Sequence, residues 1–256
     1  MKKKDRGVSA KCDFEVVDET EDWIVVEKPA PLVVHPTGGK DEPSLLGGLQ
    51  ALLSCELAGG RSLSILTRLD RETSGLVLVA KHVEAAREFA RQFEARRVLK
   101  EYLALVHGWP EWTECVCRER ILRQGEVGFS PVWVRQVVHA EGKDCETGFV
   151  VERRFEREEC GFAMIRCFPK TGRMHQIRVH LEHLGHGIVG DKLYGTDGVP
   201  YLEQVTGELS DASRSRLILP RQALHAARLA VEVGGNTRDW ESALPPDLAR
   251  FLEASV

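Results

Sequence analysis

The sequence predicts an α+β fold in which helices flank a mainly antiparallel or mixed central sheet. Residues 76–80 form an apolar, partly β-branched run, which is typical of a strand buried on both faces. Apolar residues recur at helical spacing from about 82 to 96, which indicates an amphipathic helix packed on a sheet. Strand-like runs separated by turns fill residues 115–168, which indicates an antiparallel meander.

The remaining elements follow from the same periodicities and from capping residues. Two short runs separated by an acidic turn predict a hairpin near the start of the chain. Ser44 is the predicted N-cap of the first helix. In chain order, the predicted strands are 14–17, 23–26, 63–66, 98–106, 115–122, 132–138, 149–155 and 162–168, and the predicted additional helices are 44–53, 174–184 and 246–252.

The 256 residues, 43% of them hydrophobic, are enough to bury a sizeable core. Residues 1–12 are charged and aperiodic, so they are predicted to be a flexible tail. Residues 13–256 are predicted to form a single domain. Within it, residues 196–220 show little periodicity and are interpreted as an insertion or a mobile loop.

The formal net charge of −4 argues against an indiscriminate nucleic-acid binder, because phosphate contacts need clustered Lys and Arg. A nucleic-acid site must then be a local basic patch. Residues 161–181 are the best candidate, with four basic residues and no acid. Seven cysteines without C-x-x-C spacing, and no apolar run of about 18 residues, predict a cytoplasmic protein with reduced thiols that does not cross a membrane.

A polar loop between two predicted strands is the first candidate site. It places one acid, Asp70, between Arg68 and Arg71, and it ends at residues 73–75, Thr-Ser-Gly. A plain β-turn in which these side chains bond their own backbone is the simpler interpretation. Loops held by a rigid scaffold are, however, where chemistry usually lies.

Two long motifs favour a catalytic role for this loop over a plain β-turn. Residues 68–75, Arg-Leu-Asp-x-x-Thr-Ser-Gly, with the following apolar strand, resemble the central motif of the RluA family of RNA pseudouridine synthases. Residues 171–181 and 185–195 resemble its other long signature. Shorter matches at 28–36, 100–108 and 224–226 fall in the expected order, so the resemblance spans about 14–233.

The resemblance implies a pseudouridine synthase fold with a catalytic cleft and no cofactor or metal. It implies that Asp70 is the nucleophile, that Tyr102 stacks against a flipped target base, and that Arg178 keeps Asp70 ionised. Many relatives carry an N-terminal S4 domain, for which this chain has no room. Thr67 stands where relatives often have His, and Gly187 where they often have Pro, which suggests altered substrate contacts rather than lost catalysis.

The expected substrate is a structured RNA, ribosomal or transfer, with a uridine in an accessible stem-loop, because a base leaves its stack most easily in a loop. We expect a monomer that binds this RNA. The residues expected to contact it are Arg68, Arg71, Thr73, Ser74, Lys170, Arg173, His175, Lys28 and His35.

Two other functions remain open. A non-catalytic RNA-binding or ribosome-assembly factor could keep the fold, although the intact set Asp70, Tyr102 and Arg178 argues against it. A metal-dependent hydrolase is suggested by the histidines and acids between residues 175 and 191. Their spacing does not match H-E-x-x-H, and His175 and His180 would diverge by about 140° on a helix.

Overall fold

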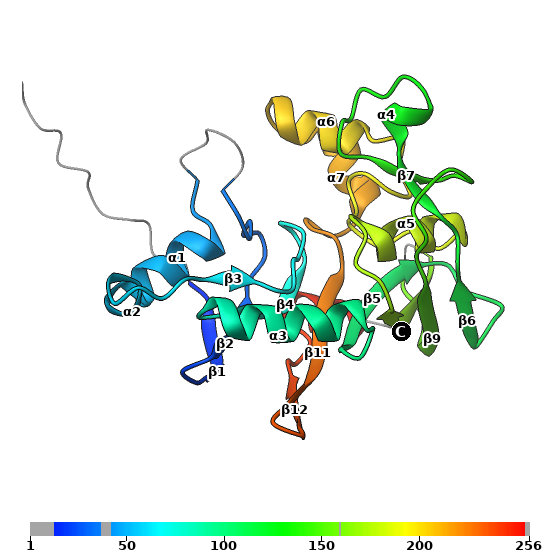
Figure 1. Ribbon diagram of the computed structural model, residues 1–256. Coiled ribbons are helices and arrows are strands. Elements are labelled where there is room, and N and C mark those ends of the chain that lie inside the picture. The colour runs from blue at the N-terminus through cyan, green and yellow to red at the C-terminus, as the bar shows by residue number, and fades with distance from the viewer. Residues whose placement is uncertain (1–12, 37–41, 159, 254–256) are drawn as a thin grey trace, which may run out of the picture. The chain divides into compact units, whose positions relative to one another are not determined.

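The computed structural model describes residues 13–36, 42–158 and 160–253, so the predicted tail at 1–12 lies outside the described residues. Contacts group the chain into two compact units, residues 1–91 and 92–256, where the sequence predicts one domain. The α+β class is confirmed (Figure 1). In the described part of the chain, no helix is both long and apolar enough to cross a membrane.

The first unit contains a small antiparallel sheet with helices beside it (Figure 1). β2 pairs with β1 and β4, and β3 pairs with β4. Every residue of β4 is buried, as the apolar run predicts. The Ser44 side chain accepts a hydrogen bond from Gly47 N–H, which confirms the predicted helix cap. The elements are β1 Glu15–Glu19, β2 Trp23–Lys28, α1 Leu45–Leu52, α2 Ser54–Ala58, β3 Ser64–Ile65, β4 Ser74–Ala80 and α3 Val83–Glu94, which ends in the second unit.

The second unit is built on an antiparallel sheet of order β12-β11-β5-β10-β9-β6. Its strands are β5 Leu99–His107, β6 Glu114–Cys117, β9 Thr147–Glu156, β10 Gly161–Pro169, β11 Leu224–Val233 and β12 Asn236–Glu241. A separate two-stranded sheet joins β7 Ile121–Arg123 to β8 Gln136–Val138, with α4 Gln124–Val127 between them. The helices that follow are α5 Gln176–His183, α6 Val199–Thr206, α7 Asp211–Leu217 and α8 Pro246–Glu253.

The core of this unit forms where α5 and α8 cover the sheet. Ile177 and Leu181 of α5 are buried with Ile165, while Phe251 of α8 packs edge-on against Phe162. Burial of such aliphatic and aromatic side chains stabilises a fold by about 1.5–3 kcal/mol each. Ile177 and Leu181 are four residues apart in α5, so they lie on the same side of the helix, and both belong to this core.

Three predicted segments differ in the structure. Residues 115–122 are not one strand, because β6 and β7 belong to different sheets. Residues 132–138 contain only the three-residue strand β8. Residues 196–220, interpreted as an insertion or mobile loop, contain α6 and α7. These helices have eight and seven residues, too few for a clear helical periodicity, and Tyr201 and Leu202 of α6 pack on the cluster around Val132.

Candidate active site

The Asp70 loop, residues 66–73, is held against the strand that follows it. Leu66 N–H donates to the carbonyl of Leu78, and Leu78 N–H donates to the hydroxyl of Thr67 at 2.9 Å. Thr73 N–H donates to the carbonyl of Asp70 and closes a tight turn. The loop therefore has a fixed backbone, and Thr67 contributes to it through its hydroxyl.

The charged side chains of the loop are accessible to solvent, whereas Thr73 and the adjacent Ser74 are buried. Arg68 and Arg71 are exposed and Asp70 is half-buried. Thr73 and Ser74 are buried, with 2% and 4% of their surface exposed. The side chains of the two arginines are therefore accessible to a bound molecule, whereas Thr73 and Ser74 have almost no exposed surface with which to make the predicted RNA contacts.

Lys28 is also fully buried, and its ammonium group is held by backbone carbonyls. Nζ donates to the carbonyls of Pro29 at 2.9 Å, Leu32 at 2.8 Å and Arg71 at 3.3 Å. Leu32 N–H donates to the same Arg71 carbonyl. The sequence predicted an RNA contact for Lys28, but in the structure this charge ties the end of β2 to the Asp70 loop. His35, in the same segment, is exposed.

Tyr102 lies in the middle of β5, opposite Cys167 of β10 and Ala226 of β11, and is half-buried. Two residues earlier, Lys100 donates from Nζ to the carbonyl of Thr171 at 3.1 Å. Burial, followed by the nearby charge of Lys170, lowers the pKa of Lys100 to about 8. Positive charge thus gathers where β5 meets the segment that precedes α5.

The segment before α5 is organised by the side chain of Gln176. Its Oε1 accepts from the hydroxyl of Thr171 and from Arg173 N–H, at 2.7 and 3.0 Å. Its Nε2 donates to the carbonyl of Glu146 and the hydroxyl of Thr147, both at 2.9 Å. The exposed side chains of Lys170 and Arg173 therefore extend from a rigid backbone.

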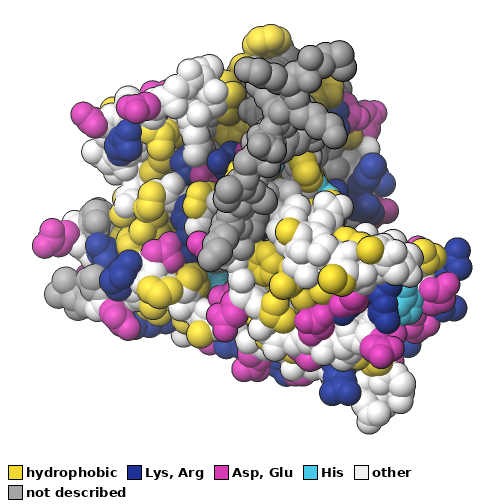
Figure 2. Space-filling model, turned by 90° about the vertical axis from the view of Figure 1, so that its left-hand side faces the viewer, with side chains coloured by type: hydrophobic (Ala, Val, Ile, Leu, Met, Phe, Trp, Pro, Cys, Tyr) yellow, Lys and Arg dark blue, Asp and Glu magenta, His cyan; other side chains and the backbone are white. Residues whose placement is uncertain are grey.

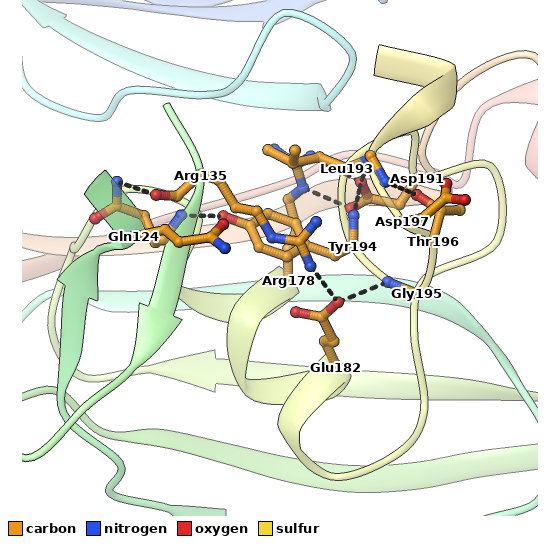
Figure 3. Close-up of polar contacts among 12 residues, drawn as sticks. Gln124, Arg135, Arg178, Glu182, Asp191, Leu193, Tyr194, Gly195, Thr196 and Asp197 are labelled. Carbon is orange, nitrogen blue, oxygen red and sulfur yellow. Dashed lines mark hydrogen bonds and ion pairs between the residues drawn. The ribbon is translucent and has the colours of Figure 1, made fainter. Parts of the chain in front are cut away.

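Arg178 of α5 is buried and forms a two-pronged ion pair with Asp191. Nε lies 2.6 Å from Oδ2 and Nη2 lies 2.8 Å from Oδ1 (Figure 3). Asp191 is itself oriented, because its Oδ1 also accepts from the N–H groups of Leu193 and Tyr194. Such charge-assisted pairs fix the plane of a guanidinium group.

The ring of Tyr194 makes a cation–π contact with this guanidinium group. The Cζ atom of Arg178 lies 4.8 Å from the ring centroid, and that of Arg135 lies 5.6 Å away (Figure 3). The Tyr194 hydroxyl accepts from Gln136 N–H and lies 2.9 Å from Nδ1 of His175. His175 itself has a left-handed backbone, with φ of 57°, so it precedes α5 rather than lying on its face as the sequence suggested.

The structure thus groups the predicted residues into separate sets. Lys28 and the Asp70 loop lie together in the first unit, while Arg178 and His175 meet at Tyr194 in the second. Sequence reasoning placed Asp191 and Tyr194 inside a motif but gave neither a role with Arg178. The signal was the order Gly-Asp-x-x-Tyr after a helix that carries a buried arginine.

The histidines that suggested a metal site have other partners. His180 is buried between the hydroxyl of Thr147 and the carbonyl of Glu119, and burial lowers its pKa. His186 lies 3.0 Å from the carbonyl of His107. Within residues 13–36, 42–158 and 160–253, no group of three or more His, Cys, Asp or Glu is arranged to hold a metal ion.

Comparisons with known proteins agree with the motifs. A family model described as RNA pseudouridylate synthase matches residues 22–183. A protein of Nitrosomonas europaea named ribosomal large subunit pseudouridine synthase D is 35% identical over 244 residues, covering 94% of this chain and 65% of the relative. Its namesake from Pasteurella multocida is 31% identical over 245 residues, covering 93% and 70%.

A solved structure shows the same fold. Human RNA pseudouridylate synthase domain containing 1 superimposes with a TM-score of 0.69 at 24% identity, over 94% of this chain and 89% of that one. A second human structure, RNA pseudouridylate synthase domain containing 4, gives a TM-score of 0.70 at 23% identity. Because both structures are less than 25% identical to this chain, the similarity is evidence for the fold alone.

Proposed function

Because this chain belongs to the RNA pseudouridylate synthase family, we propose that it isomerises a specific uridine of a structured RNA to pseudouridine. The observation that carries the proposal is the Asp70 loop, a rigid turn that presents one half-buried carboxylate between two exposed arginines. This loop lies inside the residues that the family model matches. An acid in such a turn is suited to act beside a bound phosphodiester.

The reaction breaks the C1′–N1 bond of uridine and joins C5 to C1′; a proton leaves C5 and N1 takes one up, so the product is an isomer of the substrate. Asp70 is the proposed nucleophile and must be ionised, although a pocket that expels water opposes ionisation of a carboxyl group. The Arg178 guanidinium is the proposed cation that keeps it charged. Tyr102 is the proposed platform on which the flipped base stacks.

The contacts of Arg178 refine this assignment. Its Nε and Nη2 each donate to Asp191, and these two bonds fix the plane of the guanidinium group. Asp191 and Tyr194 then act as positioning residues, since they set the plane in which Arg178 approaches an anion. Thr73, Ser74 and Lys28 have the same positioning role for Asp70, because all three are buried.

The proposed substrate is large-subunit ribosomal RNA, the substrate that the names of the relatives from Nitrosomonas and Pasteurella give. Transfer RNA is the alternative. Action on ribosomal RNA agrees with a cytoplasmic protein, and the predicted monomer remains a prediction. The exposed side chains proposed to contact this RNA are Arg68, Arg71, Lys170, Arg173 and His35.

The test is carbodiimide-based mapping of pseudouridine in unmodified ribosomal and transfer RNA after incubation with the protein. The wild-type protein should produce a new site, and Asp70→Asn should produce none while still binding the RNA. Glu72→Gln in the same loop removes one negative charge without touching the proposed nucleophile, so it should retain activity.

Each outcome is decisive for a different part of the proposal. A fully active Asp70→Asn variant would remove Asp70 from the chemistry. RNA binding without any new pseudouridine, in all the RNAs offered, would favour a non-catalytic binding factor. A new site in transfer RNA alone would support the proposed reaction and would show that the substrate is transfer RNA rather than ribosomal RNA.

A further inference from the structure

The segment between α4 and β8 exposes two aromatic side chains. We call residues 127–135 the aromatic loop. Phe129 is 94% exposed and Trp133 is 71% exposed, more than any other large hydrophobic residue that the structure describes. Single exposed hydrophobic residues are common, but here two large rings lie within five residues, and the buried Val132 between them anchors the segment.

An arginine is stacked on one of these rings. The Cζ atom of Arg123, at the end of β7, lies 4.6 Å from the centroid of the Trp133 ring. Its Nε is buried and has no hydrogen-bond partner among the residues that the structure describes. Stacking on the ring therefore orients this guanidinium, so the exposed Trp133 ring offers a π face beside the positive charge of the half-buried Arg123.

The aromatic loop is fixed to the part of the second unit that contains Arg178. Gln124 N–H donates to the carbonyl of Arg135 and closes the base of the loop (Figure 3). Arg135 donates from Nη2 to Glu182 of α5 at 3.2 Å, and Val132 is buried against Tyr194. The position of the loop is thus set by the same tyrosine that supports Arg178.

We propose that the aromatic loop binds an unpaired nucleotide of the substrate RNA. Trp133 stacks on its base, Arg123 pairs with its phosphate, and Phe129 offers a second stacking surface. The inference rests on the proposed function, because it names a subsite for the same RNA. A neutral apolar protein surface would leave the Arg123 charge uncompensated, whereas a nucleotide supplies both the ring and the anion.

Binding measurements test this subsite without depending on catalysis. The probes are an oligouridine of about 12 nucleotides, within the usual site size of single-strand binders, a duplex of the same length, and unmodified large-subunit ribosomal RNA. Trp133→Ala should weaken binding of the single strand about five- to a hundredfold, the range expected for one stacked base. It should change duplex binding much less.

Three controls separate stacking from other causes. Trp133→Phe keeps a stacking ring and should restore most of the affinity. Val205→Ala truncates another exposed hydrophobic residue, 63% exposed on α6, and should have no effect. Thermal unfolding of each variant should match that of the wild type, because Trp133 lies mostly outside the core.

The outcomes distinguish this inference from the proposed function. If Trp133→Ala binds single strand, duplex and ribosomal RNA as the wild type does, the nucleotide subsite is wrong even where pseudouridine still forms. If the wild type binds the single strand through Trp133 but forms no pseudouridine, the subsite stands and the enzymatic proposal fails. Equal loss for strand and duplex would also contradict stacking on an unpaired base.

Discussion

At the scale of single residues, the site depends on how buried charges are paired. Arg178 and Asp191 are both almost fully inaccessible to water, and their attraction must compensate a large desolvation penalty. The exposed pair Arg228 and Asp239 has similar geometry, with Nη2 at 2.5 Å from Oδ2, but water screens it. Both are therefore Arg–Asp ion pairs, and they differ in how far their side chains are buried.

The variant Asp191→Asn should be destabilised by about 3–5 kcal/mol, because it removes the negative charge that forms a two-pronged ion pair with the buried Arg178. Pseudouridine formation should fall together with stability, since the guanidinium loses the partner that orients it. Urea unfolding at neutral pH measures the first effect. The matched variant Asp239→Asn should change unfolding only slightly, and an equal loss in both variants would contradict the role of burial.

At the scale of elements, one turn connects this ion pair to the sheet. Val189 N–H donates to the carbonyl of Leu105 in β5, and the carbonyl of Val189 accepts from Ala223 N–H. Gly190 follows with φ of 75° and places Asp191 next in the chain. A Cβ atom at Gly190 would lie 2.0 Å from the carbonyl oxygen of Arg221, a backbone atom that cannot easily move.

The variant Gly190→Ala should lose about 2–6 kcal/mol, since a left-handed backbone and a steric clash each cost about 1–3 kcal/mol. Thermal unfolding should show a large decrease in midpoint. Gly128, after α4, has an extended backbone, and a Cβ atom there would meet no other atom within 4 Å. Gly128→Ala should therefore unfold like the wild type, and a normal midpoint for Gly190→Ala would show that the turn adjusts.

The elements also show where sequence patterns suffice. The buried strand β4 was predictable because seven consecutive buried residues leave an apolar run, and α1 because Ser44 has the chemistry of an N-cap. The helices α6 and α7 were missed because they have only eight and seven residues, of which only a few, such as Tyr201, pack inward. Their stability comes from tertiary contacts that local periodicity does not record.

The candidate site also contains features that the sequence predicts and features that it does not. Asp70, Tyr102 and Arg178 are proposed from motifs, because a resemblance preserves residue types at fixed spacing. The burial of Lys28 was not predictable, since its three carbonyl partners come from segments as far apart as Pro29 and Arg71. A lysine in a sequence gives no sign of whether its charge meets phosphate or folded backbone.

At the scale of the whole molecule, the question is how a protein of net charge −4 binds a polyanion. Acidic and basic side chains are interspersed over the face drawn in Figure 2, so the overall field gives little attraction. The proposed binding must come from local groups such as Lys170 and Arg173, which extend from the rigid segment before α5. Local contacts and net charge predict different responses to salt.

The variant Arg173→Gln should bind ribosomal RNA more weakly and lower the slope of log affinity against log salt concentration by about 0.7–0.9, the value for one lost phosphate contact. Arg238→Gln removes the same charge from the exposed strand β12 and should leave that slope unchanged. Affinities measured by filter binding over a range of potassium chloride concentrations give both slopes. Equal decreases in the two variants would mean that net charge, rather than the segment before α5, governs RNA binding.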